Sequence, residues 1–278
     1  LNVDFIGFHG QTIFHNPELK ISKQLGDGKL LSKLTKKKVI YDFRQKDLKN
    51  SGQGAPLTPI FHQLLYKKLK NKLNTDVIFF VNIGGIINIT NFSNLFKDEI
   101  LLAGDIGPGM CLIDKLIRDN LDQRYDENGK IAKSGKVNKR KLIKFQKKLE
   151  DSGAGKLREW IAFDDNFPND GWYFRSLDVK QFNYSNIKRL TLKDAAATLT
   201  ELTSLIIGKL YTVGSLRTTL ILCGGGRKNK FLVQKIKKNS KHLDAPYTSN
   251  VKLIDDYGID GDFIESQAFG YLAVRSFL

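Results

Sequence analysis

The sequence predicts an α/β protein, and three observations lead to this fold class. Residues 77–81 are apolar at every position, as expected of a strand that is covered on both faces of a sheet. The segment after Pro108-Gly109 repeats apolar residues at helical spacing. Glycine-rich turns separate runs of strand length from segments of helical periodicity, which is typical of alternating strands and helices.

The expected elements are as follows in chain order. Strands are predicted at residues 3–8, 38–43, 77–82, 87–91, 100–104 and 218–223. The first helix is predicted by an apolar stripe that comprises Leu112, Ile113, Leu116, Ile117 and Leu121. A second helix begins at the capping-box pattern of residues 191–194, a third covers residues 229–238, and the last begins near residue 262. Residues 168–172 are predicted to form a loop.

Length and composition limit the number of domains, the location of the protein and the state of its cysteines. Its 278 residues, 41% of them apolar, can form one large domain or two lobes with a substantial core. No apolar stretch approaches the roughly 20 residues of a membrane span and no signal-peptide pattern occurs, so we expect a cytoplasmic protein without a membrane partner. Cys111 and Cys223 lie in apolar segments without metal-ligand spacing, and we expect buried thiols rather than a disulfide.

The formal charge of +16 raises the alternative of nucleic-acid binding. The basic residues are spread along the chain, with a dense run from Lys133 to Lys148. In that run Leu142, Ile143 and Leu149 recur at roughly helical spacing, which is typical of an amphipathic helix with a solvated basic face. No aromatic platform for stacking bases is interleaved with the basic residues, so we expect no nucleic-acid partner.

Four glycine-rich turns carry the candidate chemistry. They are Phe8-His9-Gly10-Gln11-Thr12, Asn82-Ile83-Gly84-Gly85, Gly104-Asp105-Ile106-Gly107-Pro108-Gly109 and Cys223-Gly224-Gly225-Gly226. A strand that ends in glycines lets the backbone approach a ligand closely, and a following helix directs free N–H groups at anions. The four turns, one with a carboxylate, indicate an enzyme that handles phosphate groups.

Asp105 is the candidate catalytic residue, because it precedes a glycine turn and a helix N-terminus. A carboxylate there could take a proton from a water or hydroxyl, or hold a metal through water. The alternative is an Asp that only hydrogen-bonds the next amides of the turn. Gly107 and Gly109 permit close backbone approach, although a plain strand–turn–helix junction would use the same residues.

The Gly224–Gly226 turn has no side chains and would suit a flat group such as a base or ribose packed against the backbone. A tight turn between strand and helix is the alternative. The chain contains no GxxxxGK[ST] sequence, and no GxGxxG follows a strand. These absences from the sequence argue against P-loop and Rossmann nucleotide binding.

Further polar residues at the ends of predicted elements are candidates for ligand contact. His9, Gln11 and Thr12 end a probable buried strand, where polar groups are costly unless they are paired or bind a ligand. Arg44 could hold a carboxylate or phosphate, or pair with Asp42 or Asp47. Glu265 lies in the first turn of the last helix, where it could accept a hydrogen bond from a sugar or simply complement the helix dipole.

Seven segments together resemble a known family. They are IGFHGQTIFHNP (6–17), YDFRQKDLKNSGQGAPLTPIFH (41–62), VNIGGIINIT (81–90), GDIGPGMCLID (104–114), LTLKDAAATLTELT (190–203), LILCGGGRKN (220–229) and FIESQAFGYLA (263–273). In this order they are similar to anhydro-N-acetylmuramic acid kinase, a bacterial cell-wall recycling enzyme of the actin/hexokinase-like ATPase superfamily. The HGQT, GQGAP, NIGG and GPG blocks are specific in combination, whereas residues 120–190 match poorly.

The resemblance implies a two-lobed actin-like, ribonuclease H-like ATPase fold whose first lobe is incomplete. Residues 1–49 and 264–278 would belong to the N-terminal lobe and residues 50–263 to the C-terminal lobe. The family uses ATP and Mg²⁺ to open the 1,6-anhydro ring of its amino sugar with water and to phosphorylate O6. Asp105 would be the general base, Gln11 and Glu265 would face the sugar, and a homodimer is implied. The glycines of the NIGG, GPG and GGG turns, with Asn229, would line the nucleotide.

The chain departs from the family pattern in three places. The chain opens on Leu1 within an apolar run, and no Gly-Thr-Ser-x-Asp-Gly phosphate hairpin is found in it, so we expect further residues upstream. Ile106 and Met110 replace a Thr and an Asn in the glycine turn. Residues 173–176 replace a Pro-Pro-Lys-Ser segment. We therefore expect these 278 residues alone to be inactive; the alternative is a family member without activity that binds a sugar or a partner.

Overall fold

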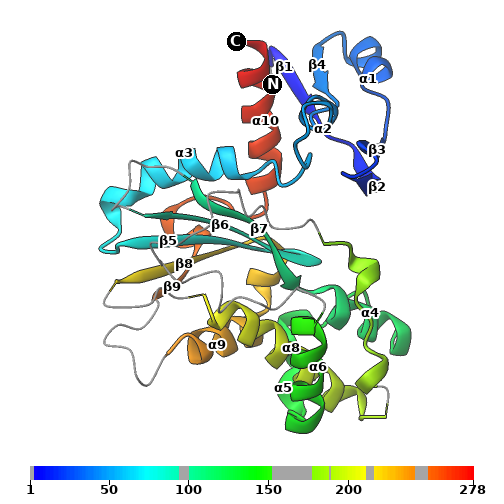
Figure 1. The fold of residues 1–278 in the computed structure, drawn as a ribbon, viewed down its shortest axis with the longest axis vertical. Coiled ribbons are helices and arrows are strands. Elements are labelled where there is room, and N and C mark those ends of the chain that lie inside the picture. The colour runs from blue at the N-terminus through cyan, green and yellow to red at the C-terminus, as the bar shows by residue number, and fades with distance from the viewer. Residues whose placement is uncertain (1–2, 94–99, 152–176, 188, 211–215, 242–249) are drawn as a thin grey trace. The chain divides into compact units, whose positions relative to one another are not determined.

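The computed structural model of the chain describes residues 3–93, 100–151, 177–187, 189–210, 216–241 and 250–278 (Figure 1). The strands are β1 (Phe5–Phe8), β2 (Gln11–Asn16), β3 (Ile21–Leu25), β4 (Lys38–Tyr41), β5 (Val77–Ile83), β6 (Ile86–Ser93), β7 (Ile100–Pro108), β8 (Thr218–Cys223) and β9 (Asn250–Leu253). The α-helices are α1 (Gly28–Thr35), α2 (Gln45–Lys49), α3 (Pro59–Leu69), α4 (Cys111–Asn120), α5 (Lys130–Ser134), α6 (Lys139–Asp151), α8 (Leu192–Gly208), α9 (Lys230–Asn239) and α10 (Ile264–Phe277). Two short 3-10 helices also matter below, η5 (Gly225–Lys228) and η6 (Ile254–Tyr257).

The mixed α/β class is confirmed, and each predicted strand and helix in the described residues is present. The prediction was wrong for the end of β7, which continues to Pro108 and so contains Asp105 and Gly107 within a strand. The sequence did not predict the β2–β3 hairpin, β9, or the helices α1 to α3. The loop predicted at residues 168–172 lies outside the described residues.

The chain divides into two compact units, one made of Leu1–Leu65 with Phe263–Leu278 and the other of Tyr66–Asp262. In the first unit β1 pairs in parallel with β4, and β2 pairs with β3 as an antiparallel hairpin. Figure 1 shows β1 beside α10. A side chain at Gly7 of β1 would come within 2.5 Å of the carbonyl oxygen of Phe269, so a glycine is needed where this strand meets α10.

The second unit is built on a mixed sheet with the strand order β7-β6-β5-β8-β9 among the described residues. The β5, β8 and β9 strands run in parallel, whereas β6 is antiparallel to both β5 and β7. Asn82 of β5 lies opposite Cys223 of β8 and also opposite Asn88 of β6. The carboxyl ends of β5, β7 and β8 therefore meet at one edge of this sheet.

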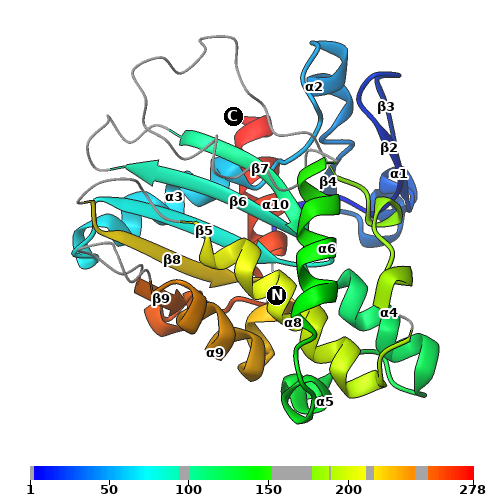
Figure 2. The ribbon, with the colours of Figure 1, turned by 60° about the horizontal axis from the view of Figure 1, so that its bottom comes forward.

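Helices cover one face of this sheet, as Figure 2 shows for α8 and α9. The core of the unit joins Val77, Phe79 and Val81 of β5 to apolar side chains of α4, α6, α8 and α9. From the other face Tyr66, at the end of α3, stacks on Phe92 of β6 with ring centroids 4.7 Å apart. The continuous apolar run of β5 is explained, because residues of both parities are fully buried.

The start of α8 shows part of the capping pattern that the sequence predicts. The hydroxyl of Thr191 accepts a hydrogen bond from the amide of Asp194, which is half of the predicted capping box. The carboxylate of Asp194 instead accepts from the amide of Lys136 at 2.8 Å.

Both cysteines are buried free thiols, as predicted, and burial raises the pKa of Cys223 to about 12.

The basic segment is confirmed as amphipathic, with Leu142 and Leu149 of α6 buried in the core. Ile143 was expected on the same apolar face, but it is 64% exposed among the lysines. In the ranges that the structure describes, no helix has both the length and the apolar character needed to cross a membrane.

His62 of α3 gives the first unit a pH-sensitive core position. The side chain is only 1% exposed, and burial lowers its pKa from 6.5 to about 4. In the unfolded chain the imidazole takes up its proton near pH 6.5, so between these two values the unfolded state binds more protons than the folded state.

We expect the free energy of unfolding to fall by about 3 kcal/mol as the pH decreases from 6.5 to 4, because of His62. Urea unfolding followed at several pH values will measure this slope, and His62→Gln should flatten it. An equally steep slope in the variant would assign the effect to other groups.

Candidate active site

The three glycine turns of the second unit lie at one edge of the sheet. Gly84 and Gly85 follow β5, and the Gly224–Gly226 turn follows the neighbouring strand β8. Pro108, at the end of β7, is paired with Ile86 directly after Gly85. In α/β sheets, ligands bind outside the carboxyl ends of the strands, which is where these turns lie.

Backbone hydrogen bonds join two of these turns. The amide of Gly109 donates to the carbonyl of Gly85 at 2.9 Å, and the amide of Met110 donates to the carbonyl of Gly84 at 2.8 Å. A side chain at Gly109 would come within 2.4 Å of the Gly84 oxygen. Glycine is therefore required at position 109 for the two turns to meet, and the helix α4 begins from this junction.

The predicted glycines divide into two groups by their surroundings. Gly224 and Gly226 are required by packing, because a side chain at either would come within 2.3 Å of Asn82 or Ile83. In contrast, a Cβ at Gly225 would meet nothing within 4 Å, and at Gly84 and Gly85 it would make only ordinary contacts. Packing within the described residues therefore does not explain these last three glycines. Gly107 lies in β7 opposite Ile87.

Asp105 is half-buried and held on both carboxylate oxygens. Oδ1 accepts a hydrogen bond from Nδ2 of Asn88 at 3.0 Å, and Oδ2 accepts from the amide of Leu177 at 2.8 Å. These bonds fix the orientation of the carboxylate next to the turn that starts at Gly107. The residue is thus a strand residue with defined partners, not the turn-forming Asp of the alternative interpretation.

Sequence reasoning did not find Asn88. It alternates with Ile87 and Ile89, which are fully buried in the core, whereas the amide side chain reaches the carboxylate of Asp105. Its Oδ1 is buried and accepts no hydrogen bond within the described residues. A polar residue between two isoleucines of a strand was the available signal, since such a residue needs a partner.

Ile106 and Met110, the two departures in this turn, both belong to the apolar core. They are 2% and 9% exposed, respectively. An apolar side chain suits these surroundings in this chain, so the two substitutions need no loss of function to explain them. The third departure, at residues 173–176, lies outside the described residues.

Asn229 has a structural role that the sequence prediction did not include. Its Oδ1 accepts from the amide of Leu232 at 3.0 Å and so caps the start of α9. The residue is 5% exposed, and its Nδ2 makes no hydrogen bond within the described residues. The cap holds the end of the GGG turn to the helix that follows it.

In the first unit His9 and Arg44 form one cluster. Nε of Arg44 donates to Nε2 of His9 at 3.0 Å, and Nη1 of Arg44 donates to the carbonyl of Gly54 at 2.7 Å. The imidazole stacks on Phe269 of α10 with ring centroids 4.2 Å apart. Burial, and then the Arg44 charge, lower the pKa of His9, which keeps the imidazole neutral and able to accept from the guanidinium.

The other predicted residues of this unit are less constrained. Gln11 is exposed on β2, and Thr12 accepts a hydrogen bond from Gln24 of β3 at 3.3 Å. Glu265 is exposed in the first turn of α10, as predicted. Asp47, an alternative partner for Arg44, accepts instead from the amide of Gly54 at 2.6 Å. The structure thus brings His9 and Arg44 together, and places Asp105 and the glycine turns in the other unit.

The features of the second unit define an α/β protein with bare backbone and an oriented carboxylate at the carboxyl edge of its sheet. A family model described as anhydro-N-acetylmuramic acid kinase matches residues 1–277. The chain belongs to this family, and its class is therefore that of the phosphotransferases.

Relatives named anhydro-N-acetylmuramic acid kinase are similar along the whole chain. The protein of Pelagibacter ubique is 45% identical over 283 residues, which cover 100% of this chain and 68% of the relative. The proteins of Brucella canis and Agrobacterium fabrum are 37% and 35% identical, and each match covers 99% of this chain and 67% of the relative. The chain thus spans about two thirds of the length of these relatives.

Two glycine substitutions test the junction between the turn at Gly84–Gly85 and the turn at Gly109. Gly109→Ala should lower the free energy of unfolding by about 1 to 3 kcal/mol, because the new methyl group would collide with the Gly84 carbonyl. Gly225→Ala should change it by less than about 0.5 kcal/mol, since the space around Gly225 is open. Urea unfolding of both variants will measure this difference; equal losses would contradict the described junction.

Proposed function

We propose that the protein acts in the ATP-dependent conversion of 1,6-anhydro-N-acetylmuramic acid to N-acetylmuramic acid 6-phosphate, a step of peptidoglycan recycling. Family membership over residues 1–277 supports this activity. The observation that carries the proposal is the meeting of the NIGG, GPG and GGG turns at the sheet edge beside Asp105.

In the proposed reaction, Asp105 takes a proton from the attacking water. The water oxygen bonds to the anomeric carbon as the bond from that carbon to O6 breaks. O6 then bonds to the γ-phosphorus of ATP, the bond from that phosphorus to the β–γ bridging oxygen breaks, and ADP leaves. Asp105 finally releases its proton to solvent. Asn88 and the Leu177 amide keep both carboxylate oxygens in place, so little reorganisation is needed as the proton moves.

ATP is the phosphoryl donor expected of a kinase family, and the glycine turns fit it. The open surroundings of Gly84, Gly85 and Gly225 would let a nucleotide lie against the backbone, and we assign Gly107, Gly109, Gly224, Gly226 and Asn229 to the same wall. Mg²⁺ would neutralise phosphate charge. In the described part of the chain no three His, Cys, Asp or Glu residues group as metal ligands, which fits an ion held largely by phosphates and water.

We assign the sugar to residues of the first unit. His9 and Arg44 form a polar cluster that is already ordered by Gly54 and Phe269, and Gln11, Thr12 and Glu265 offer further hydrogen-bonding groups. The division of the chain into two compact units is what the actin-like two-lobed fold would require. The homodimer and the cytoplasmic location stay predictions.

A family member that binds without turnover is the second candidate. Ile106 and Met110 favour this candidate, because they replace a Thr and an Asn of the family in the glycine turn. Both side chains are buried in the apolar core, which gives the replacements a structural explanation instead. Calorimetry with the anhydro sugar, alongside an activity assay, separates the two candidates.

The 278 residues by themselves should not phosphorylate the anhydro sugar. They contain no Gly-Thr-Ser-x-Asp-Gly hairpin, whose backbone amides would hold the β- and γ-phosphates, and losing one such donor alone costs about 10²–10³ in rate. A coupled ADP-release assay of the purified chain tests this. Turnover at rates usual for kinases would show that the hairpin is dispensable.

A chimera tests the role of Asp105 itself. The part of the Pelagibacter ubique relative that the match leaves uncovered would be joined to this chain, so that the chimera spans the full length of that relative. In that chimera Asp105→Asn should lower kcat by about 10²–10⁴, because the base is lost while its size is kept. The control Asp194→Asn changes a carboxylate that holds the Lys136 amide and the Thr191 hydroxyl and does not bond Asp105, and it should leave kcat unchanged. Full activity of the Asp105 variant would remove it from the mechanism.

A further inference from the structure

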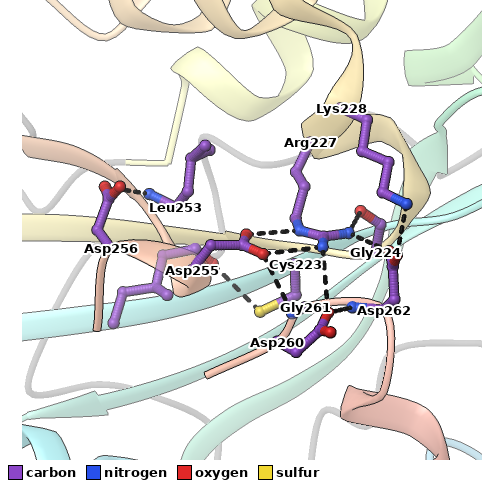
Figure 3. Close-up of polar contacts among 11 residues, drawn as sticks. Cys223, Gly224, Arg227, Lys228, Leu253, Asp255, Asp256, Asp260, Gly261 and Asp262 are labelled. Atoms are coloured by element: carbon purple, nitrogen blue, oxygen red, sulfur yellow. Dashed lines mark hydrogen bonds and ion pairs between the residues drawn. The ribbon is translucent and has the colours of Figure 1, made fainter. Parts of the chain in front are cut away.

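Directly after the GGG turn, Arg227 of η5 is the centre of a charged cluster (Figure 3). Its side chain is only 4% exposed. Nε and Nη2 donate to the two oxygens of Asp255 at 2.7 and 3.0 Å, and Nη1 donates to Asp262 Oδ1 at 2.9 Å. Gly261 leaves room for the guanidinium, since a side chain there would come within 2.2 Å of Nε.

The same guanidinium also holds the backbone of the glycine turn. Nη1 donates a second hydrogen bond, to the carbonyl oxygen of Gly224 at 3.0 Å. Gly224 has a φ of 76°, a left-handed conformation that favours glycine. In a planar trans peptide the C=O and N–H point in opposite directions, so fixing the Gly224 carbonyl also fixes the direction of the Gly225 N–H. That N–H is thereby directed away from Arg227.

Asp262 links this cluster to the chain that follows. It is the last residue of the second unit, and α10 with Glu265 begins two residues later. Lys228 also contacts Asp262, so two consecutive basic residues of η5 hold its carboxylate. The turn after β8 and the start of the segment that leads to α10 are therefore tied together through one carboxylate.

We propose that Arg227 is a positioning residue for the nucleotide: it sets the orientation of the Gly224–Gly225 peptide and anchors the GGG turn to Asp262. This inference rests on the proposed function for the identity of the ligand. Its structural part, the ordering of the turn, stands on the hydrogen bonds of Arg227 alone.

The chemistry of the cluster suits this role better than a general stabilising one. The two carboxylates are each more than 40% exposed and so can also accept from water, which means that they do not need Arg227 to satisfy buried acids. The hydrogen bonds of Arg227 are directional, since four N–H groups of its planar guanidinium each donate to a different oxygen. Arg227 lowers the pKa of Asp255 to about 2, so the cluster stays charged at any physiological pH.

The chain offers a matched control in Arg217. Its Nη2 and Nε also bind both oxygens of one carboxylate, that of Asp76, at 3.0 and 3.2 Å. This pair precedes β5 and β8, at the opposite edge of the sheet from the glycine turns. Arg217→Lys therefore removes the same kind of contact without touching the GGG turn.

The experiment compares Arg227→Lys, Asp262→Asn and Arg217→Lys in the whole chain. The first readout needs no ligand: exchange of the backbone amides at positions 227 and 229, which are bonded to Gly224 and Gly226, should become about tenfold faster in both cluster variants. The second readout is the affinity for ATP by calorimetry, which should weaken about tenfold in the same two variants. Arg217→Lys should change neither quantity. Asp262→Asn is included because it is milder and keeps Arg227 in place.

Each outcome decides a separate point. Unchanged exchange at the turn in both cluster variants would overturn the positioning role, as would unchanged ATP affinity in a parent chain that binds ATP. Faster exchange spread over the whole sheet would assign Arg227 a structural role instead and equally overturn the inference. Absence of ATP binding both in the parent chain and in the chimera described above would contradict the proposed nucleotide site, and the exchange data would still decide whether Arg227 orders the turn.

Discussion

Two backbone hydrogen bonds, from Gly109 and Met110 to the carbonyls of Gly85 and Gly84, are the constraint on which the second unit depends. They fix the end of β7 against the turn after β5, and α4 starts from that point. Since β5 is also paired with β8, the GGG turn is held in the same frame. The proposed nucleotide site would thus be built largely from main chain, whose geometry does not depend on the surface side chains around it.

The two units contribute different kinds of groups. The second supplies bare backbone and one oriented carboxylate, Asp105, and the first supplies a polar cluster around Arg44. Such a division would suit the proposed reaction, in which a nucleotide and a sugar are both bound and bulk water must be kept from hydrolysing ATP. The chain belongs to a family of this kind, so the chemistry of the two groups agrees with the family.

Much of this arrangement could be predicted from the sequence, for physical reasons that differ between elements. β5 and α8 have strong local patterns, a continuous apolar run and a capped amphipathic stripe, and both were found. The β2–β3 hairpin was not, because Ile13 and Phe14 are exposed and its strands lack simple alternation. Asp105 was found by its position, but its partner Asn88 depends on pairing between strands that local sequence does not reveal.

The close packing of Gly7 on Phe269 has a consequence for how the protein is made. The first unit combines residues 1–65 with α10, so α10 cannot pack on β1 and β4 until residues 264–277 have been synthesised. The second unit is continuous in sequence from Tyr66 to Asp262 and can fold during synthesis. Until α10 is made, β1 and β4 lack this helix and expose strand surface of the kind that leads to wrong pairing with other chains.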